Sequence, residues 1–248
     1  MIKAILFDLD DTLLDIRLEY FLFHYISGQA HIFSDISGKS YPAAFGSLVN
    51  AYLTINNQKR TDGLTNRELF NATLGKSLEI TPEDPMVMDA LHCYDTEIVP
   101  SMNKKGFFES RPEPGANEAI QKIQDMGLTM ALATNTLFSL EADMVRLGWA
   151  GIEDAPFVAI STIDTATRTK PSARYYQEFL GQIGFSAAEC LMVGNDIQRD
   201  FPHPDIGLPT AYVGHANPRR AVFRGNLHQF AQELPRLVES LNAQKSEN

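Results

Sequence analysis

The sequence has little cysteine, and its histidines form no metal-binding pattern. Only two cysteines, Cys93 and Cys190, occur in 248 residues, which excludes a disulfide framework. Cys190 lies in an apolar run, as expected of a small buried side chain. The six histidines include no HExxH or HxxxH arrangement, and no cysteine pair has the spacing of a zinc site. The composition therefore gives no indication of structural or catalytic zinc.

Positive charge and long hydrophobic runs are also scarce. The chain has 21 Lys and Arg against 31 Asp and Glu, a net charge of −10. We therefore expect no nucleic-acid and no membrane partner, since both require a basic face. No run approaches the roughly 18 apolar residues of a membrane span, and the apolar part of MIKAILFDLD is too short for a secretory signal. These absences predict a cytoplasmic protein, in which an anionic substrate would need a locally positive site.

Short apolar runs and amphipathic segments alternate in the second half of the chain, which predicts an α/β fold. Five runs read as buried strands, namely Ile2–Phe7, Thr129–Ala133, Phe157–Ile160, Cys190–Val193 and Thr210–Val213. Helices are predicted near 115–126, 137–147, 172–183 and 227–241, followed by a frayed polar tail over 242–248. In the second helix, Leu137, Leu140, Met144 and Leu147 are expected to form the buried face. This alternation is typical of a doubly wound, Rossmann-like parallel sheet.

The stretch from 15 to 110 differs from the rest, because it has helical patterning and no convincing strand. We predict that it is an inserted all-helical cap domain. Residues 1–14 and 111–248 would then form the α/β core domain, since the first apolar run has the composition of a strand of the same sheet.

Four polar clusters lie at or shortly after the predicted ends of strands. They are Asp8–Thr12, Thr134–Asn135, Lys170–Ser172 and Gly194–Asp200. In open α/β sheets, ligands bind at the carboxyl ends of the strands. We therefore expect these clusters to converge on one edge of the sheet.

The residue types in these clusters indicate phosphoryl chemistry. Clustered carboxylates repel each other and require a cation, and oxygen ligands without His or Cys favour Mg²⁺. A lysine and a hydroxyl beside the metal suit the oxygens of a phosphoryl group, and a free carboxylate can act as nucleophile through an aspartyl-phosphate. Metal and lysine together would provide the positive site that an acidic protein needs.

The order of these residues resembles that of the haloacid dehalogenase-like (HAD) hydrolase superfamily. The resemblance rests on Asp8-x-Asp10-x-Thr12, Thr134, Lys170 and Gly194-Asn195-Asp196-x-x-x-Asp200. The segment 114–135 also resembles the first core helix and second strand of that family, and the insert has the position of its helical (C1-type) cap. The resemblance covers residues 1–14 and about 110–240.

The resemblance implies a role for each matching residue. Asp8 matches the nucleophile, and Asp10 matches the general acid that protonates the leaving group and then activates water. Thr134 matches the hydroxyl that holds a phosphoryl oxygen, and Lys170 matches the cation that steadies nucleophile and phosphate. The predicted phosphate-binding set is Thr12, Thr134, Asn135 and Lys170.

The predicted Mg²⁺ ligands are Asp8, Asp10 through its carbonyl, and Asp196. The fourth motif departs from the family, because Asn195 precedes the acid. Alignment on Gly194 would give the acidic position to Asn195, and alignment on the spacing to Asp200 gives it to Asp196. We favour Asp196 because an anionic ligand suits Mg²⁺ better. Asn195 and Asp200 remain further candidates, as ligands or, for Asp200, as the residue that orients the lysine.

Asp10 separates the reaction classes within the superfamily. A halide leaves without a proton, whereas the alkoxide of a phosphate ester benefits from a general acid. We therefore expect Mg²⁺-dependent hydrolysis of a small phosphate monoester, a phosphorylated metabolite, through phospho-Asp8, by a monomer or homodimer. The alternatives are a phosphomutase of the same superfamily and a non-catalytic module that binds a phosphorylated ligand.

Overall fold

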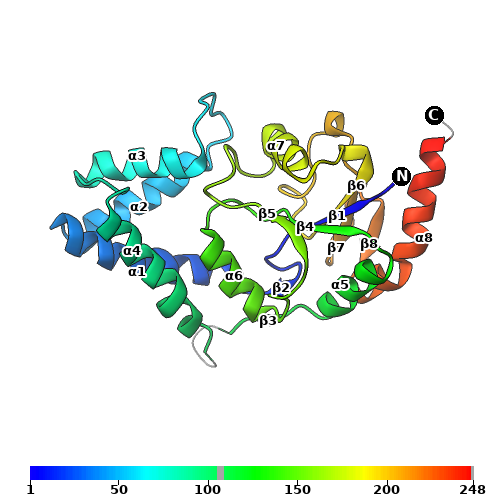
Figure 1. Cartoon of the computed structure of the whole chain (residues 1–248), viewed down its shortest axis with the longest axis horizontal. Coiled ribbons are helices and arrows are strands. Elements are labelled where there is room, and N and C mark those ends of the chain that lie inside the picture. The colour runs from blue at the N-terminus through cyan, green and yellow to red at the C-terminus, as the bar shows by residue number, and fades with distance from the viewer. Residues whose placement is uncertain (105–108, 247–248) are drawn as a thin grey trace.

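The computed structural model describes residues 1–104 and 109–246, and within these ranges six strands form one parallel sheet (Figure 1). The strand order is β5-β4-β1-β6-β7-β8. The strands are β1 (Ala4–Phe7), β4 (Thr129–Leu132), β5 (Phe157–Ile160), β6 (Cys190–Gly194), β7 (Thr210–Val213) and β8 (Phe223–Gly225). The predicted α/β sheet is confirmed. Strand β8 was not predicted, because three residues with an exposed arginine in the middle show no apolar run.

Strand β1 lies at the centre of the sheet and is buried along its whole length. Ile5 and Phe7 contribute to one hydrophobic core, whereas Ala4 and Leu6 contribute to a second core on the other face. Burial on both faces explains why this strand is a continuous apolar run. Phe7 pairs with Leu132 of β4 and with Val193 of β6, so these three strands end at the same level.

Helices cover both faces of the sheet, as a doubly wound core requires. They are α5 (Ala116–Asp125), α6 (Leu140–Trp149), α7 (Ala173–Ile183) and α8 (Leu227–Ser246). Helices α5 and α8 share the core of Ile5 and Phe7, and α7 belongs to the core of Ala4 and Leu6. The sequence predicted a frayed tail from residue 242, but α8 continues to Ser246. Residues 247 and 248 of that tail lie outside the described residues.

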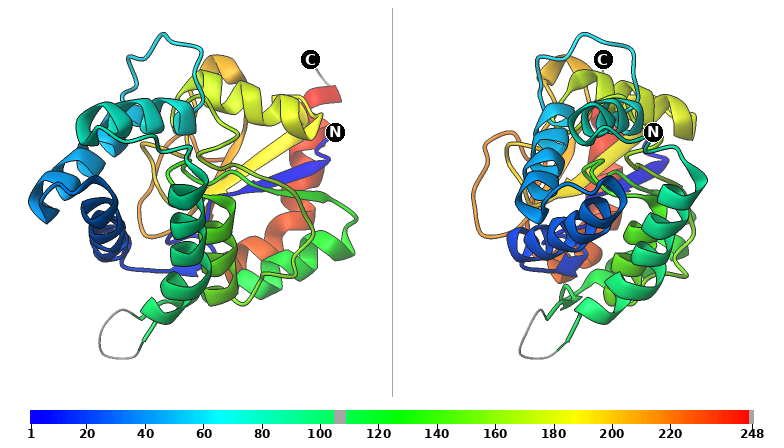
Figure 2. Two further views of the ribbon diagram at one scale, coloured as in Figure 1. Left: turned by 60° about the vertical axis from the view of Figure 1, so that its left-hand side comes forward. Right: turned by 90° about the vertical axis from the view of Figure 1, so that its left-hand side faces the viewer.

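A group of helices is inserted between β1 and the later strands, on one side of the core (Figure 2). It contains α1 (Leu18–Ser37), α2 (Tyr41–Ile55), α3 (Asn66–Leu78) and α4 (Pro85–Cys93), followed by a π turn (Tyr94–Ile98) and a 3₁₀ turn (Val99–Met102). Residues 105–108 of the predicted insert lie outside the described residues. The predicted helical insertion is confirmed. We refer to it below as the cap.

A short antiparallel pairing joins the two ends of the cap at its base. Strand β2 (Leu14–Asp15) pairs with β3 (Arg111–Pro112). An ion pair of 2.8 Å between Arg111 Nε and Asp15 Oδ2 supports this pairing. The pairing was not predicted, because two residues are too few to show the alternation of a strand. No helix in the described parts of the chain has both the length and the apolar character of a membrane span.

Candidate active site

The predicted polar clusters meet at the carboxyl edge of the sheet around a buried lysine. Lys170 Nζ lies 2.5 Å from Asp8 Oδ1 and 2.6 Å from Asp200 Oδ1. Asp8 follows β1 directly, and its backbone N–H donates to the carbonyl of Val193 in β6. Lys170 and Asp200 are almost completely inaccessible to solvent. Residues predicted from three separate motifs therefore share one ion-pair network.

The charged groups of this network shift each other's pKa values. Burial lowers the pKa of Lys170, but the carboxylates of Asp200 and Asp8 outweigh burial and raise it above its usual range. Burial raises the pKa of Asp8 to about 7, against the opposing effect of the Lys170 ammonium group. The lysine is therefore held as a cation, and Asp8 is a carboxylate whose charge depends on that neighbour.

Thr12 links the loop after β1 to the loop after β6. Its hydroxyl lies 3.3 Å from Asp8 Oδ2 and 3.1 Å from Asn195 Oδ1, and it is fully buried. Because a hydroxyl has one proton, it donates to one of these oxygens at a time. The contact brings the Asn195 amide oxygen next to the nucleophile candidate.

The side chain of Asp196 is directed elsewhere. Its Oδ1 accepts hydrogen bonds from the backbone N–H groups of Gln198 and Arg199, at 2.7 and 3.2 Å. The side chain is 39% exposed and also contacts the Arg199 guanidinium at 3.5 Å. Asp196 therefore caps the turn that follows β6, and its backbone N–H donates to Asp200 Oδ2 at 2.9 Å.

Gly194 is required by this turn. A Cβ at this position would lie 2.2 Å from Asp200 Oδ2, a distance that real Cβ atoms do not reach. The absence of a side chain thus allows Asp200 to fold back against β6 and bind both Lys170 and the Asp196 amide. This requirement gives a physical reason for the glycine at the start of the fourth motif.

Thr134 and Asn135 present polar atoms that are buried and lack a hydrogen-bond partner among the described residues. These atoms are Thr134 Oγ1 and both side-chain heteroatoms of Asn135. The Thr134 carbonyl, in contrast, accepts from Tyr175 at 2.9 Å and from Ser161 at 2.8 Å. Because a buried polar group without a partner costs about 1–3 kcal/mol, these atoms are suited to receive a polar ligand.

Asp10 forms an ion pair that was not predicted. Its Oδ1 accepts from Arg146 Nη2, and Arg146 Nη1 donates to Asp143 Oδ1 at 2.6 Å. Arg146 is fully buried, and burial raises the pKa of Asp143 to about 7 even though the arginine opposes this. Both Arg146 and Asp143 belong to α6.

The buried face predicted for α6 is therefore wrong in part. Leu140 and Met144 are 47% and 38% exposed, whereas Asp143 and Arg146 are buried beside Leu147. Hydrophobic periodicity cannot reveal a buried face that carries an ion pair. The only available signal was the spacing of Asp143 and Arg146, which is equally typical of an exposed helix pair.

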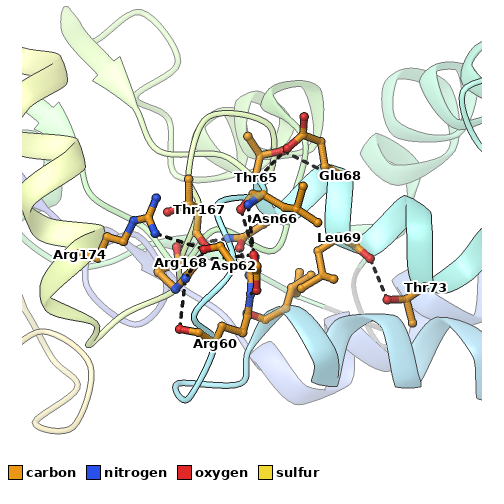
Figure 3. A network of polar contacts seen from close by, with 12 residues as sticks. Arg60, Asp62, Thr65, Asn66, Glu68, Leu69, Thr73, Thr167, Arg168 and Arg174 are labelled. Atoms are coloured by element: carbon orange, nitrogen blue, oxygen red, sulfur yellow. Dashed lines mark hydrogen bonds and ion pairs between the residues drawn. The ribbon is translucent and has the colours of Figure 1, made fainter.

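The cap contacts both active-site loops through the segment that joins α2 to α3 and the first residue of α3. Figure 3 shows Arg60 and Asp62 of this segment, and Asn66 at the start of α3, facing Arg168 of the core. Asn66 Nδ2 donates to Thr136 Oγ1 at 2.7 Å and to the Arg168 carbonyl at 3.2 Å. Since Thr136 and Arg168 lie two residues from Thr134 and Lys170 respectively, one buried cap side chain connects both loops.

Further hydrogen bonds reinforce this attachment, which we call the cap clamp (residues 56–67 with 163–170 and 136). Gln58 Nε2 donates to Thr169 Oγ1 at 2.8 Å and to the Lys170 carbonyl at 3.3 Å. Arg168 donates to the carbonyls of Arg60 and Asp62. The clamp was not predicted, because these residues have the composition of an ordinary polar loop.

The oxygen atoms near Asp8 fit a hard divalent cation. The Thr12 hydroxyl lies within 3.3 Å of both Asp8 Oδ2 and Asn195 Oδ1, and all three groups have oxygen atoms that can coordinate a metal. In the part of the chain that the structure describes, no three His, Cys, Asp or Glu side chains are placed to share a metal ion. A metal would therefore take part of its coordination from an amide or backbone carbonyl, as Mg²⁺ sites do.

The chain matches known proteins along most of its length. It is 31% identical over 59% of its length to a phosphoglycolate phosphatase of Mesorhizobium japonicum, of which it spans 60%. It is 25% identical over 88% of its length to the N-acetylmuramic acid 6-phosphate phosphatase of Pseudomonas aeruginosa, of which it spans 84%.

The fold is shared with solved structures as well. A HAD phosphatase from Thermococcus onnurineus superposes with a TM-score of 0.56 at 18% identity, covering 96% of this chain and 98% of the other. The haloacid dehalogenase-like hydrolase family matches residues 2–202 of the chain. This span contains the central strand, the whole cap and every residue of the ion-pair network around Lys170. The protein belongs to the haloacid dehalogenase-like hydrolase family.

Proposed function

We propose that the protein hydrolyses a small phosphate monoester through an aspartyl-phosphate on Asp8. The observation that carries this proposal is the buried contact between Lys170 and Asp8, beside buried polar atoms of Thr134 and Asn135 that have no partner among the described residues. The names of the curated relatives support a phosphorylated substrate, since they include phosphoglycolate and N-acetylmuramic acid 6-phosphate phosphatases.

In the first half of the reaction, the Asp8 carboxylate attacks phosphorus and the bond to the alcohol oxygen breaks. Asp10 donates a proton to that oxygen, so the alcohol leaves neutral. Among the described residues, Lys170 donates to Asp8 Oδ1, and the Thr12 hydroxyl lies 3.3 Å from Asp8 Oδ2.

In the second half, Asp10 takes a proton from water as the water oxygen attacks phosphorus. The bond between phosphorus and Asp8 then breaks, and phosphate is released with the Asp8 carboxylate restored. The Thr134 hydroxyl, the Asn135 amide and Lys170 would donate to the phosphoryl oxygens. Donors that are fixed in a buried site stabilise developing charge more strongly than water does.

We further propose that Asp8, the Asp10 carbonyl and the residue after Gly194 would hold Mg²⁺. For the third ligand we now favour Asn195 over Asp196, because Asn195 contacts Thr12 whereas the Asp196 carboxylate caps a turn. When bound, the metal would supply positive charge to the phosphoryl oxygens. We also propose two domains. The core domain comprises residues 1–14 and 111–248, and the cap domain comprises residues 15–110.

The test is a phosphate-release screen over phosphorylated metabolites with Mg²⁺, run beside Asp8→Asn. We expect wild type to release phosphate and the variant to release none, because an amide cannot form the phospho-intermediate. Equal release by both proteins would exclude Asp8 as nucleophile. Loss of the ester without free phosphate, with transfer to a sugar phosphate, would indicate a phosphomutase instead.

A further inference from the structure

Arg146 is a buried charge that the proposed reaction does not use. It lies in the second turn of α6, is fully inaccessible to solvent, and bridges Asp10 and Asp143. Its guanidinium also lies 4.3 Å from the centre of the Phe138 ring and 5.7 Å from that of Phe21 in the cap. A buried ion pair contributes little net stability, since desolvation offsets the attraction. Stability alone therefore does not explain why a buried arginine lies beside Asp10.

The two contacts of the arginine differ in what they connect. Asp143 is buried on the same helix, three residues away, and can anchor the guanidinium without any other partner. Asp10 comes from the loop after β1, 136 residues away in sequence. The fork geometry of a guanidinium fixes the direction of one arm when the other is held. Asp143 therefore anchors an arm that reaches Asp10.

The contact leaves one oxygen of Asp10 available. Asp10 Oδ1 is bound to Arg146, whereas Oδ2 accepts no hydrogen bond from the described residues, and the side chain is 12% exposed. A carboxyl group that serves first as general acid and then as general base must hold the same orientation in both steps. Holding one carboxylate oxygen presents the other in a fixed direction.

We propose that Arg146 is a positioning residue that orients the Asp10 carboxylate for proton transfer. This inference rests on the proposed function, because it assumes that Asp10 serves as general acid and base. Arg146 touches neither substrate nor phosphorus, and it acts only through Asp10. Loss of Arg146 would slow hydrolysis most for substrates whose leaving oxygen must be protonated.

The experiment compares an alkyl phosphate with 4-nitrophenyl phosphate, whose leaving group needs little protonation. Variants Arg146→Met, Arg146→Lys and Asp10→Asn are measured with both, and Arg146→Met is also combined with Asp10→Asn. Asp143→Asn is the matched control, since its amide oxygen can still accept from Arg146.

We expect R146M to lower kcat on the alkyl phosphate about tenfold or more, up to the roughly 10²–10⁴-fold that general acids contribute. On 4-nitrophenyl phosphate it should lose about threefold or less, and in the D10N background it should have almost no further effect. D143N should keep the wild-type ratio between the two substrates. R146K, which keeps the cation but not the fork, should show a smaller loss with the same substrate preference.

Equal losses on both substrates, or a full loss that persists in the D10N background, would overturn the inference while leaving the proposed function intact. If R146M does not fold, the rates of R146K provide the test. Wild-type rates of R146K on both esters would then overturn the inference. A wild-type protein that releases phosphate from neither ester would refute the proposed function, and the inference with it.

Discussion

Replacing Lys170 by methionine would leave two buried carboxylates without their shared counterion. Lys170 Nζ is the cation between Asp8 and Asp200, and all three side chains are at least nine-tenths buried. Breaking a buried ion pair by removing one partner costs about 3–5 kcal/mol. We therefore expect K170M to lose about this much unfolding free energy at pH 8, which lies above the pKa of about 7 of Asp8.

The loss should shrink as the pH falls. The pKa of Asp8 is already raised to about 7 with the lysine present, and removing the lysine removes an effect that lowers it. A carboxyl group with a raised pKa in the folded state makes stability fall as pH rises from its unfolded pKa to its folded one. At pH 5, the folded variant can bind a proton and neutralise one orphaned carboxylate, so its deficit should be smaller than at pH 8.

Urea unfolding of wild type and K170M at pH 5 and pH 8, in buffer with a metal chelator, measures the effect. Asp200→Asn in the K170M background is the control, because it removes one of the two orphaned charges. This double variant should recover part of the stability at pH 8 but none of the phosphate release. A deficit below about 1 kcal/mol at pH 8, or an equal deficit at both pH values, would refute the assigned electrostatics.

Three further changes test the geometry around this network. Asn66→Asp keeps the shape of the clamp residue but removes its hydrogen-bond donor to Thr136. Urea unfolding should therefore show a loss of about 1–3 kcal/mol in unfolding free energy, and phosphate release should fall. Unchanged values for both would contradict a role for the clamp. Gly194→Ala should displace the Asp200 carboxylate and abolish activity, which a crystal structure and a phosphate assay would reveal. Asn195→Ala should raise the Mg²⁺ concentration needed for half-maximal activity more than Asp196→Asn does; the reverse order would identify Asp196 as the ligand.

The sequence predicted the sheet and the convergence of the polar clusters because both depend on short-range patterns. Buried strands are continuous apolar runs, and a polar residue directly after such a run lies at the strand end. Asp8 is the clearest case, since it follows the four buried residues of β1. Its contact with Lys170, 162 residues away in the sequence, was implied by the resemblance to the HAD superfamily.

Arg146 and Asn66 could not be found in the same way. Both are polar residues that are fully buried because of partners far away in sequence, at Asp10 and Arg168. Burial of a polar side chain depends on tertiary contacts, and hydrophobic periodicity counts such residues as solvent-exposed. Leu140 of α6 shows the opposite case, because this apolar residue was predicted to be buried but is exposed to solvent.

The clamp has a consequence for the timing of the reaction. Lifting the cap from the core would break the hydrogen bonds of Gln58 and Asn66, and these bonds hold the loops of Lys170 and Thr134. An open molecule would therefore bind phosphate less firmly and attack it more slowly than a closed one. We expect the chemical steps to be restricted to intervals in which the cap encloses the ester. A phosphorylated Asp8 formed in such an interval would be protected from acceptors in bulk solvent until the cap opens again.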